Sequence, residues 1–193
     1  MIIDISQEVF SCKVFPGDPA PTAQRMLSMD KDDVCNLTAF SMCAHNGPHV
    51  DAPFHFLSNG NTIEKIDLEA FVGDCYVARH EGNLIADDVA GVLEKAREAG
   101  ASERILIAGK ATVTAEAARV FAQAKIKLIG NESQTVGPED APMEVHKILL
   151  GADIVLLEGI VLTDVAEGRY FLSAAPLNLA GCDGAPCRAF LVG

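Results

Sequence analysis

The chain has 193 residues and a formal net charge of −12, with 49% hydrophobic and 22% charged residues. This length suits one domain with a core of its own, and the composition is globular rather than disordered, collagen-like or coiled-coil. An acidic surface repels nucleic-acid phosphates and anionic lipids, so we expect neither nucleic acid nor a membrane as partner. We therefore predict a single domain over residues 1–193.

The first residues of the sequence and the cysteines indicate the cellular location to expect. No basic segment followed by an apolar run opens the sequence, and apolar stretches such as residues 154–157 are far shorter than the ~20 residues that cross a bilayer. The six cysteines are scattered, without a CxxC pair or zinc-finger spacing. We expect reduced thiols, several of them buried in strands, in a cytoplasmic protein.

Short strands are predicted in the first third of the chain. Residues 1–5, 36–44 and 75–79 are rich in β-branched, aromatic and small residues, as strands are. Between the first two, Phe15-Pro-Gly-Asp-Pro-Ala-Pro has the residues of turns and predicts a loop. Glu81-Gly-Asn predicts a further turn after the third strand.

The middle of the chain alternates strands with helices. An apolar stripe predicts a helix over residues 87–100 that ends at a glycine. Thr114 can cap a second helix, and residues 138–150 carry a third. Strands are predicted at 104–108, 126–129 and 154–157 and, in the tail, at 169–175 and 187–192. This alternation predicts an α/β fold with parallel strands and right-handed crossovers, between a β-rich start and a β-rich end.

Three of the five histidines fall in the stretch His45-Asn-Gly-Pro-His49-Val-Asp51-Ala-Pro-Phe-His55. In an extended segment His49 and Asp51 point to the same side, and His55 follows Asp51 with the same parity. The turn at residues 46–48 can fold His45 back toward them. Imidazole and carboxylate are the usual ligands of zinc, manganese or iron, so the cluster predicts metal ligands or proton carriers rather than incidental surface histidines.

A second signal is Glu158, which lies inside an apolar run. A carboxylate in a buried strand is costly unless it is paired or bound to a metal. His146 precedes it by twelve residues on the third predicted helix, and the chain turns between them at Gly151. The two side chains can therefore approach each other. The alternative is that His146 is an ordinary helix residue and Glu158 marks the exposed end of a strand.

The histidine loop resembles the HxGTHxDxPxH signature of the cyclase-like metal-dependent hydrolases, which include bacterial kynurenine formamidases and isatin hydrolases. Phe15-Pro-Gly-Asp resembles an early loop of that family, and residues 128–135 resemble its LIGxDxxS segment. The stretches at residues 175–177 and 183–189 resemble its closing motif. The likeness covers most of the chain. It implies a swivelling β/β/α fold with mixed sheets, and a homodimer or larger homo-oligomer.

The resemblance also implies a set of metal ligands. His45, His49 and Asp51 correspond to the ligands of a first divalent ion, for which zinc or manganese is expected. Asp51 would bridge to a second ion that His146 and Glu158 also bind. The twelve-residue spacing of that last pair agrees with the family.

The resemblance implies that His55 corresponds to a catalytic acid/base. Because the chain has no tryptophan, stacking on a substrate ring must come from Phe or Tyr. Phe15 is the candidate, and the alternative is that it packs against the core. The implied activity is hydrolysis of a small amide or lactam, of which an N-formyl arylamine is the best-known case. Imidazole titrates near neutrality and can pass a proton from water to a leaving nitrogen.

Three positions depart from the family pattern. Pro48 replaces a threonine, Glu132 stands where an aspartate is usual, and residues 107–110 replace a segment that contains Arg-Thr. Two other functions stay open at this point. One is a metal-dependent small-molecule-binding protein without hydrolase activity, and the other is a cyclase or dehydratase that acts on a carbonyl compound.

Overall fold

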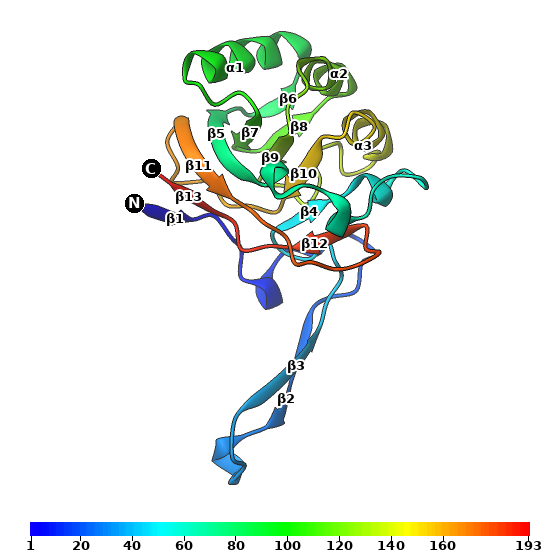
Figure 1. Cartoon of the computed structure of the whole chain (residues 1–193), viewed down its shortest axis with the longest axis vertical. Helices are drawn as coiled ribbons and strands as arrows, with labels where there is room; N and C mark the ends of the chain where they lie inside the picture. Colours follow the sequence, from blue (N-terminus) through cyan, green and yellow to red (C-terminus); the bar gives the residue numbers. More distant parts are fainter.

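A nine-stranded mixed sheet with helices on one face forms the body of the molecule (Figure 1). The computed structural model describes all residues from 1 to 193. The strand order is β1-β13-β11-β5-β7-β9-β10-β4-β12. These strands are β1 (Ile2–Asp4), β4 (His49–Asp51), β5 (Val72–Arg79), β7 (Arg104–Ala108), β9 (Leu128–Asn131), β10 (Val155–Glu158), β11 (Gly168–Ser173), β12 (Gly184–Pro186) and β13 (Phe190–Val192). None of the helices has the length and apolar character needed to span a membrane.

The centre of the sheet is parallel, as the alternation of elements predicts. Strands β5, β7, β9 and β10 run in the same direction, and the helices α1 (Ala86–Glu98), α2 (Ala115–Ala124) and α3 (Met143–Leu150) fall between them along the chain. Successive residues of a strand face opposite sides of a sheet. Ile105 and Ile107 accordingly pack in the cluster under the helices, and Leu106 packs in the cluster on the other face. The predicted α/β class is confirmed.

The ends of the helices follow their local sequence. The Thr114 hydroxyl accepts a hydrogen bond from the Ala117 amide at 3.2 Å and caps α2. Gly100, at a φ of +68°, follows α1 in the left-handed conformation that glycine adopts without strain. Helix α3 begins at Met143, later than predicted. Pro142 disfavours a helical backbone at the residue before it, so the helix starts after the proline.

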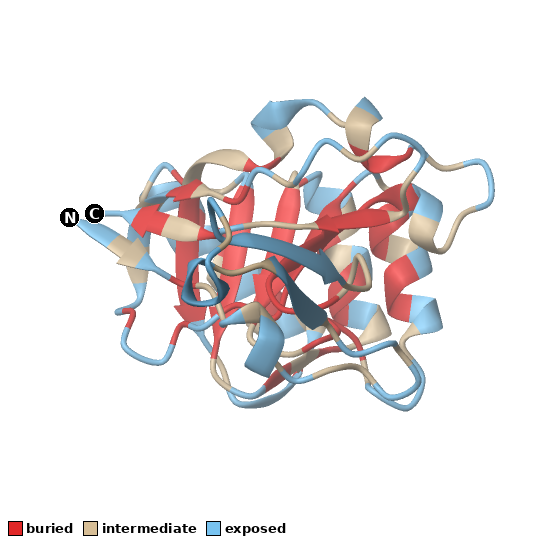
Figure 2. Ribbon diagram, turned by 90° about the horizontal axis from the view of Figure 1, so that it is seen from below, coloured by how far each residue is buried: buried red, intermediate tan, exposed pale blue.

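Two small strand pairs lie outside the main sheet. Strands β2 (Thr22–Leu27) and β3 (Leu37–Ser41) form an antiparallel hairpin, which we call the arm, that stands away from the body (Figure 1). Its side chains are almost all exposed (Figure 2). Strand β6 (Gly82–Leu84) pairs in parallel with β8 (Ala111–Val113).

Some local predictions were wrong. Strand β2 was not predicted, because no face of it is buried and its sequence has no alternation to detect. The turn predicted at residues 81–83 is largely strand β6. All six cysteines are free, but only Cys75 is buried, so the expectation of several buried thiols was wrong.

Candidate metal centre

The pairing of two strands brings three of the predicted ligands onto one face of the sheet. Strand β4 runs antiparallel to β10, with His49 opposite Glu158 and Asp51 opposite Leu156. Residues that lie opposite each other on neighbouring strands share a face, as do alternate residues of one strand. His49, Asp51 and Glu158 therefore project to the same side as Leu156, which packs in the cluster under the helices.

Helix α3 supplies the fourth side chain from above that face. His146 Nε2 lies 3.3 Å from Glu158 Oε1 and 3.6 Å from Asp51 Oδ2. His49 Nε2 lies 3.4 Å from Glu158 Oε2 and 3.5 Å from Asp51 Oδ1. All four side chains are almost completely buried, so Glu158 does not mark an exposed strand end.

Both imidazoles of this group are oriented by backbone carbonyls. His49 Nδ1 donates to the Gly47 oxygen at 2.9 Å, and His146 Nδ1 donates to the Pro142 oxygen at 2.8 Å. With the proton fixed on Nδ1, each ring presents Nε2 to the carboxylates. This arrangement is the usual one for histidines that bind metals.

The charge of the group favours a cation between the side chains. Burial lowers the pKa of His49 and His146, but the hydrogen bonds and negative charges of Glu158 and Asp51 outweigh burial and raise both pKa values. One Asp51 oxygen, Oδ2, is buried without a hydrogen-bond partner in the chain. Two Nε2 atoms and two carboxylates, one of which keeps an unpaired oxygen, fit a divalent metal ion.

His45 is held differently, since both of its ring nitrogens face carboxylates. Nδ1 lies 2.8 Å from Asp51 Oδ1 and Nε2 lies 3.0 Å from Asp183 Oδ2. Burial lowers the pKa of His45, but hydrogen bonds to Asp183 and Asp51 outweigh burial and raise the pKa to about 11. As placed, the ring donates from both nitrogens, and it must release a proton to bind a metal.

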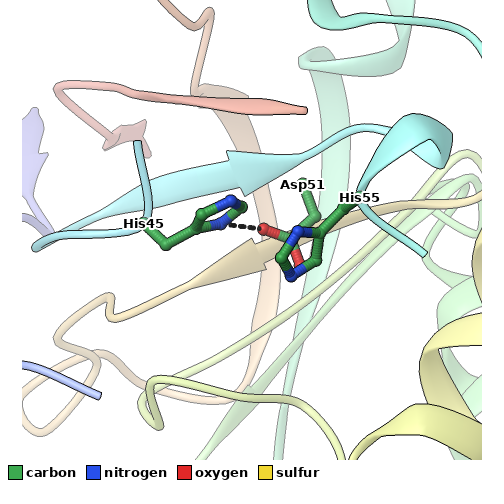
Figure 3. A group of neighbouring side chains, drawn as sticks. All are labelled: His45, Asp51 and His55. Atoms are coloured by element: carbon green, nitrogen blue, oxygen red, sulfur yellow. Dashed lines mark hydrogen bonds and ion pairs between the residues drawn. The ribbon is translucent and has the colours of Figure 1, made fainter. Parts of the chain in front are cut away.

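His55 lies beside Asp51 and His45 (Figure 3). Its Nδ1 is 3.0 Å from Asp183 Oδ2, and its ring centroid is 4.1 Å from that of His45. The parity argument for its position was wrong, because His55 ends a short 3₁₀ turn that begins at Pro53 and is not extended. The turn places the ring beside the buried side chains of this group.

Asp183 is a residue of the site that the sequence did not single out. It precedes β12 and is the shared partner of His45 and His55, whose hydrogen bonds hold the pKa of its carboxyl well below the usual range. The contact with His55 joins residues 128 positions apart. The only available signal was its place in the closing motif of the family.

A cavity of about 200 Å³ opens onto this group of residues. His45, His49, His55, His146 and Glu158 contribute to its walls, and half-buried Phe15 lines it as well. The structure thus brings the five predicted ligands, the predicted acid/base and Phe15 to one place. Asp51 lies beneath, within 3.6 Å of three of the histidines.

The departures from the family pattern neither line this cavity nor belong to the predicted ligand set. The Glu132 carboxylate accepts hydrogen bonds from the Gly109 and Leu162 amides at 2.7 Å each, so it ties loops together. Glu132 and Lys110 line a separate, polar cavity of about 780 Å³. The Pro48 carbonyl accepts a hydrogen bond from the Cys187 amide at 2.9 Å.

Comparison with known families places the chain in one of them. A family model described as a putative cyclase matches residues 3–138. The chain belongs to the cyclase family. The resemblance of its motifs to that family is confirmed.

Several relatives of this cyclase-family chain match along nearly its whole length. It is 32% identical over 206 residues to a kynurenine formamidase of Erythrobacter litoralis (strain HTCC2594), covering 98% of this chain and 93% of the relative. It is 34% identical over 211 residues to a kynurenine formamidase of Salinibacter ruber (strain DSM 13855 / M31), covering 98% and 96%.

Solved structures share its fold. A potential metal-dependent hydrolase with cyclase activity superposes with a TM-score of 0.82 at 27% identity, covering 99% of this chain and 96% of that one. Isatin hydrolase A from Labrenzia aggregata, bound to benzyl benzoate, superposes with a TM-score of 0.81 at 23% identity, covering 99% and 93%. The expected cyclase-like fold is confirmed.

Proposed function

We propose that this chain is a metal-dependent hydrolase of a small amide or lactam, with an N-formyl arylamine as the favoured substrate. The observation that carries the proposal is the buried Asp51 carboxylate, which faces two Nε2 atoms and keeps one oxygen unpaired. Relatives named kynurenine formamidase support a non-peptide C–N bond as the target.

The metal ligands in this proposal are His45, His49, Asp51, His146 and Glu158, which hold one or two zinc or manganese ions. The metal, when bound, polarises a carbonyl and lowers the pKa of water. The two carboxylates offset its charge. The carbonyl contacts of His49 and His146 keep their Nε2 atoms aimed at it.

His55 serves as the acid/base. Its Nδ1 is taken by Asp183, and Nε2 is left free to accept a proton from water and deliver it to the leaving nitrogen. Asp183 fixes the ring in that tautomer, as a carboxylate behind a catalytic histidine does. Phe15 packs against the aromatic ring of the substrate.

A homo-oligomer is part of the proposal, and the arm supports it. A two-stranded hairpin on its own is marginally stable in water. This one exposes Met26, Met29, Val34, Leu37 and Phe40, each by more than half. A second copy of the chain that covers these side chains would stabilise the arm.

Phe40→Asp should then shift the mass measured by light scattering toward that of the monomer. Gln24→Glu, which changes an exposed polar residue of the arm, should leave the mass unchanged.

Two broader expectations belong to the same proposal. Residues 1–193 act as one domain, which is supported by a sheet that takes strands from both ends of the chain. A cytoplasmic location, expected from the cysteines, remains a proposal.

The test is an assay of protein stripped of metal and reloaded with zinc or manganese. We expect hydrolysis of N-formylaniline and of a lactam to return with the metal, and metal analysis to give one or two ions per chain. Metal uptake without turnover would favour the binding-protein alternative. Ring closure or loss of water from a carbonyl compound, without hydrolysis of either amide, would favour the cyclase or dehydratase alternative.

A further inference from the structure

Gln134 is a polar side chain of the candidate site to which no role has been given. It follows β9 and lines the cavity of the candidate metal centre together with His49 and Glu158. It is only 5% exposed. Both of its amide atoms, Oε1 and Nε2, are buried without a hydrogen-bond partner in the chain.

The Gln134 carboxamide lies in space that a side chain at Gly159 would otherwise fill. A Cβ at Gly159 would lie 2.5 Å from the Gly47 oxygen and 2.6 Å from Gln134 Nε2, and Gly159 has a φ of +68°. Gly159 is itself fixed, since its amide donates to the Ser133 oxygen and its carbonyl accepts from Gln7 Nε2, each at 2.7 Å. The glycine directly after Glu158 therefore leaves room for the side chain of Gln134 beside the ligands.

An unpaired buried carboxamide is unfavourable for folding. Burying a polar group without hydrogen bonds costs free energy, and an apolar side chain of similar shape would avoid that cost. Buried polar groups in native proteins nearly always have partners. Local features that work against stability tend to occur at functional sites. The missing partner of Gln134 is therefore to be sought in a ligand of the cavity.

We propose that Gln134 binds the amide group of the substrate, an inference that rests on the proposed hydrolase function. Gln134 Nε2 donates to the substrate carbonyl oxygen, and Gln134 Oε1 accepts from the substrate N–H. A primary carboxamide makes this pair of hydrogen bonds with an amide whose N–H and C=O lie on one edge, as in a lactam or the matching rotamer of a formanilide. Gln134 thereby selects an N–H amide over an ester of the same shape.

The test compares Gln134→Leu with wild type on two matched substrates, N-formylaniline and phenyl formate, which differ by N–H against O. We expect kcat/KM for the amide to fall about 10- to 100-fold, the size expected for two neutral hydrogen bonds. The enzyme-catalysed rate on the ester should fall less, by about 3- to 10-fold, because the ester keeps the carbonyl that accepts from Nε2 but has no N–H for Oε1. Gln123→Leu, on the exposed side of α2, is the matched control and should match wild type on both.

Thermal melting separates substrate recognition from a structural role. A Gln134→Leu protein that lacks only a ligand-binding group should melt at or above the wild-type temperature and keep its metal. A lower melting temperature with equal losses on both substrates would overturn the inference, as would unchanged rates on both. If Leu does not fold, the unbranched Gln134→Met variant takes its place.

Different results would contradict the proposed hydrolase function and the role of Gln134. A wild-type protein that hydrolyses neither compound after metal loading would contradict the proposed function and this inference with it. An active wild type whose amide-to-ester preference survives in Gln134→Leu would contradict only the role of Gln134.

Discussion

The buried and the open halves of the candidate site are held by different means. His49, Asp51, His146 and Glu158 have side chains that are 1–3% exposed, and backbone carbonyls set the two imidazoles. His45, His55 and Asp183 have side chains that are 12%, 26% and 41% exposed, and they hydrogen-bond to one another through a carboxylate. Rigid, dry donors suit a metal ion, and the more exposed ring of His55 suits exchange of protons with water. His45, a proposed ligand, contacts both halves through Asp51 and Asp183.

Asp51→Asn should have the largest effect, because Asp51 contacts both halves. The change keeps the size of the side chain but removes the charge that offsets a dication. We expect metal content and turnover to be lost together, with hydrolysis at the uncatalysed rate. Elemental analysis and a rate measurement on one preparation check this, with exposed Asp87→Asn as the matched control. An Asp51→Asn protein with full metal would contradict the assigned role.

His55→Ala should separate metal binding from acid–base catalysis. We expect metal content close to that of wild type and turnover about 10²–10⁴-fold lower, the usual range for losing general acid–base catalysis. Loss of metal would instead make His55 a ligand, and an unchanged rate would make it a packing residue. His80, a half-buried histidine outside the site, changed to Ala, is the control for both measurements.

Chelation should affect stability through the proposed metal ligands and not through His55. Metal at about 100 times its Kd stabilises the folded state by about 2.7 kcal/mol. For a chain of this size each kcal/mol corresponds to about 2–4 °C in Tm, so chelator should lower Tm by about 5–11 °C. The drop should be preserved in His55→Ala and much smaller in Asp51→Asn. Melting curves that chelator leaves unchanged in all three proteins, wild type included, would contradict a metal bound to the folded state.

Asp183→Asn should have the smallest effect, because Asp183 acts through other side chains. We expect a loss of about 10- to 100-fold in turnover with metal retained, the range found for residues that orient a catalytic or metal-binding group. The double variant with His55→Ala should lose less than the two single losses multiplied, since the positioning of His55 by Asp183 disappears with the ring. Additive losses would show that Asp183 acts independently of His55.

Features set by neighbouring residues, such as strand bounds, could be predicted from the sequence. Contacts between segments far apart along the chain could not. Strand β7 was predicted at its observed bounds, since its five residues are all buried. The shared face of His49 and Asp51 follows from their spacing alone. Asp183 was missed because its contact with His55 spans 128 positions. His55 was placed by the wrong argument because Pro53 starts a turn there, and the exposed arm carries no burial pattern to detect.

The most direct test of the division between the two halves is the position of the metal in crystals of the zinc-loaded protein, located by anomalous diffraction. We predict a peak about 2.0–2.2 Å from His49 Nε2 or His146 Nε2 and from an oxygen of Asp51 or Glu158. We predict no bond from the metal to His55. A peak bound to His55 and Asp183, with the buried carboxylates left free, would contradict the account.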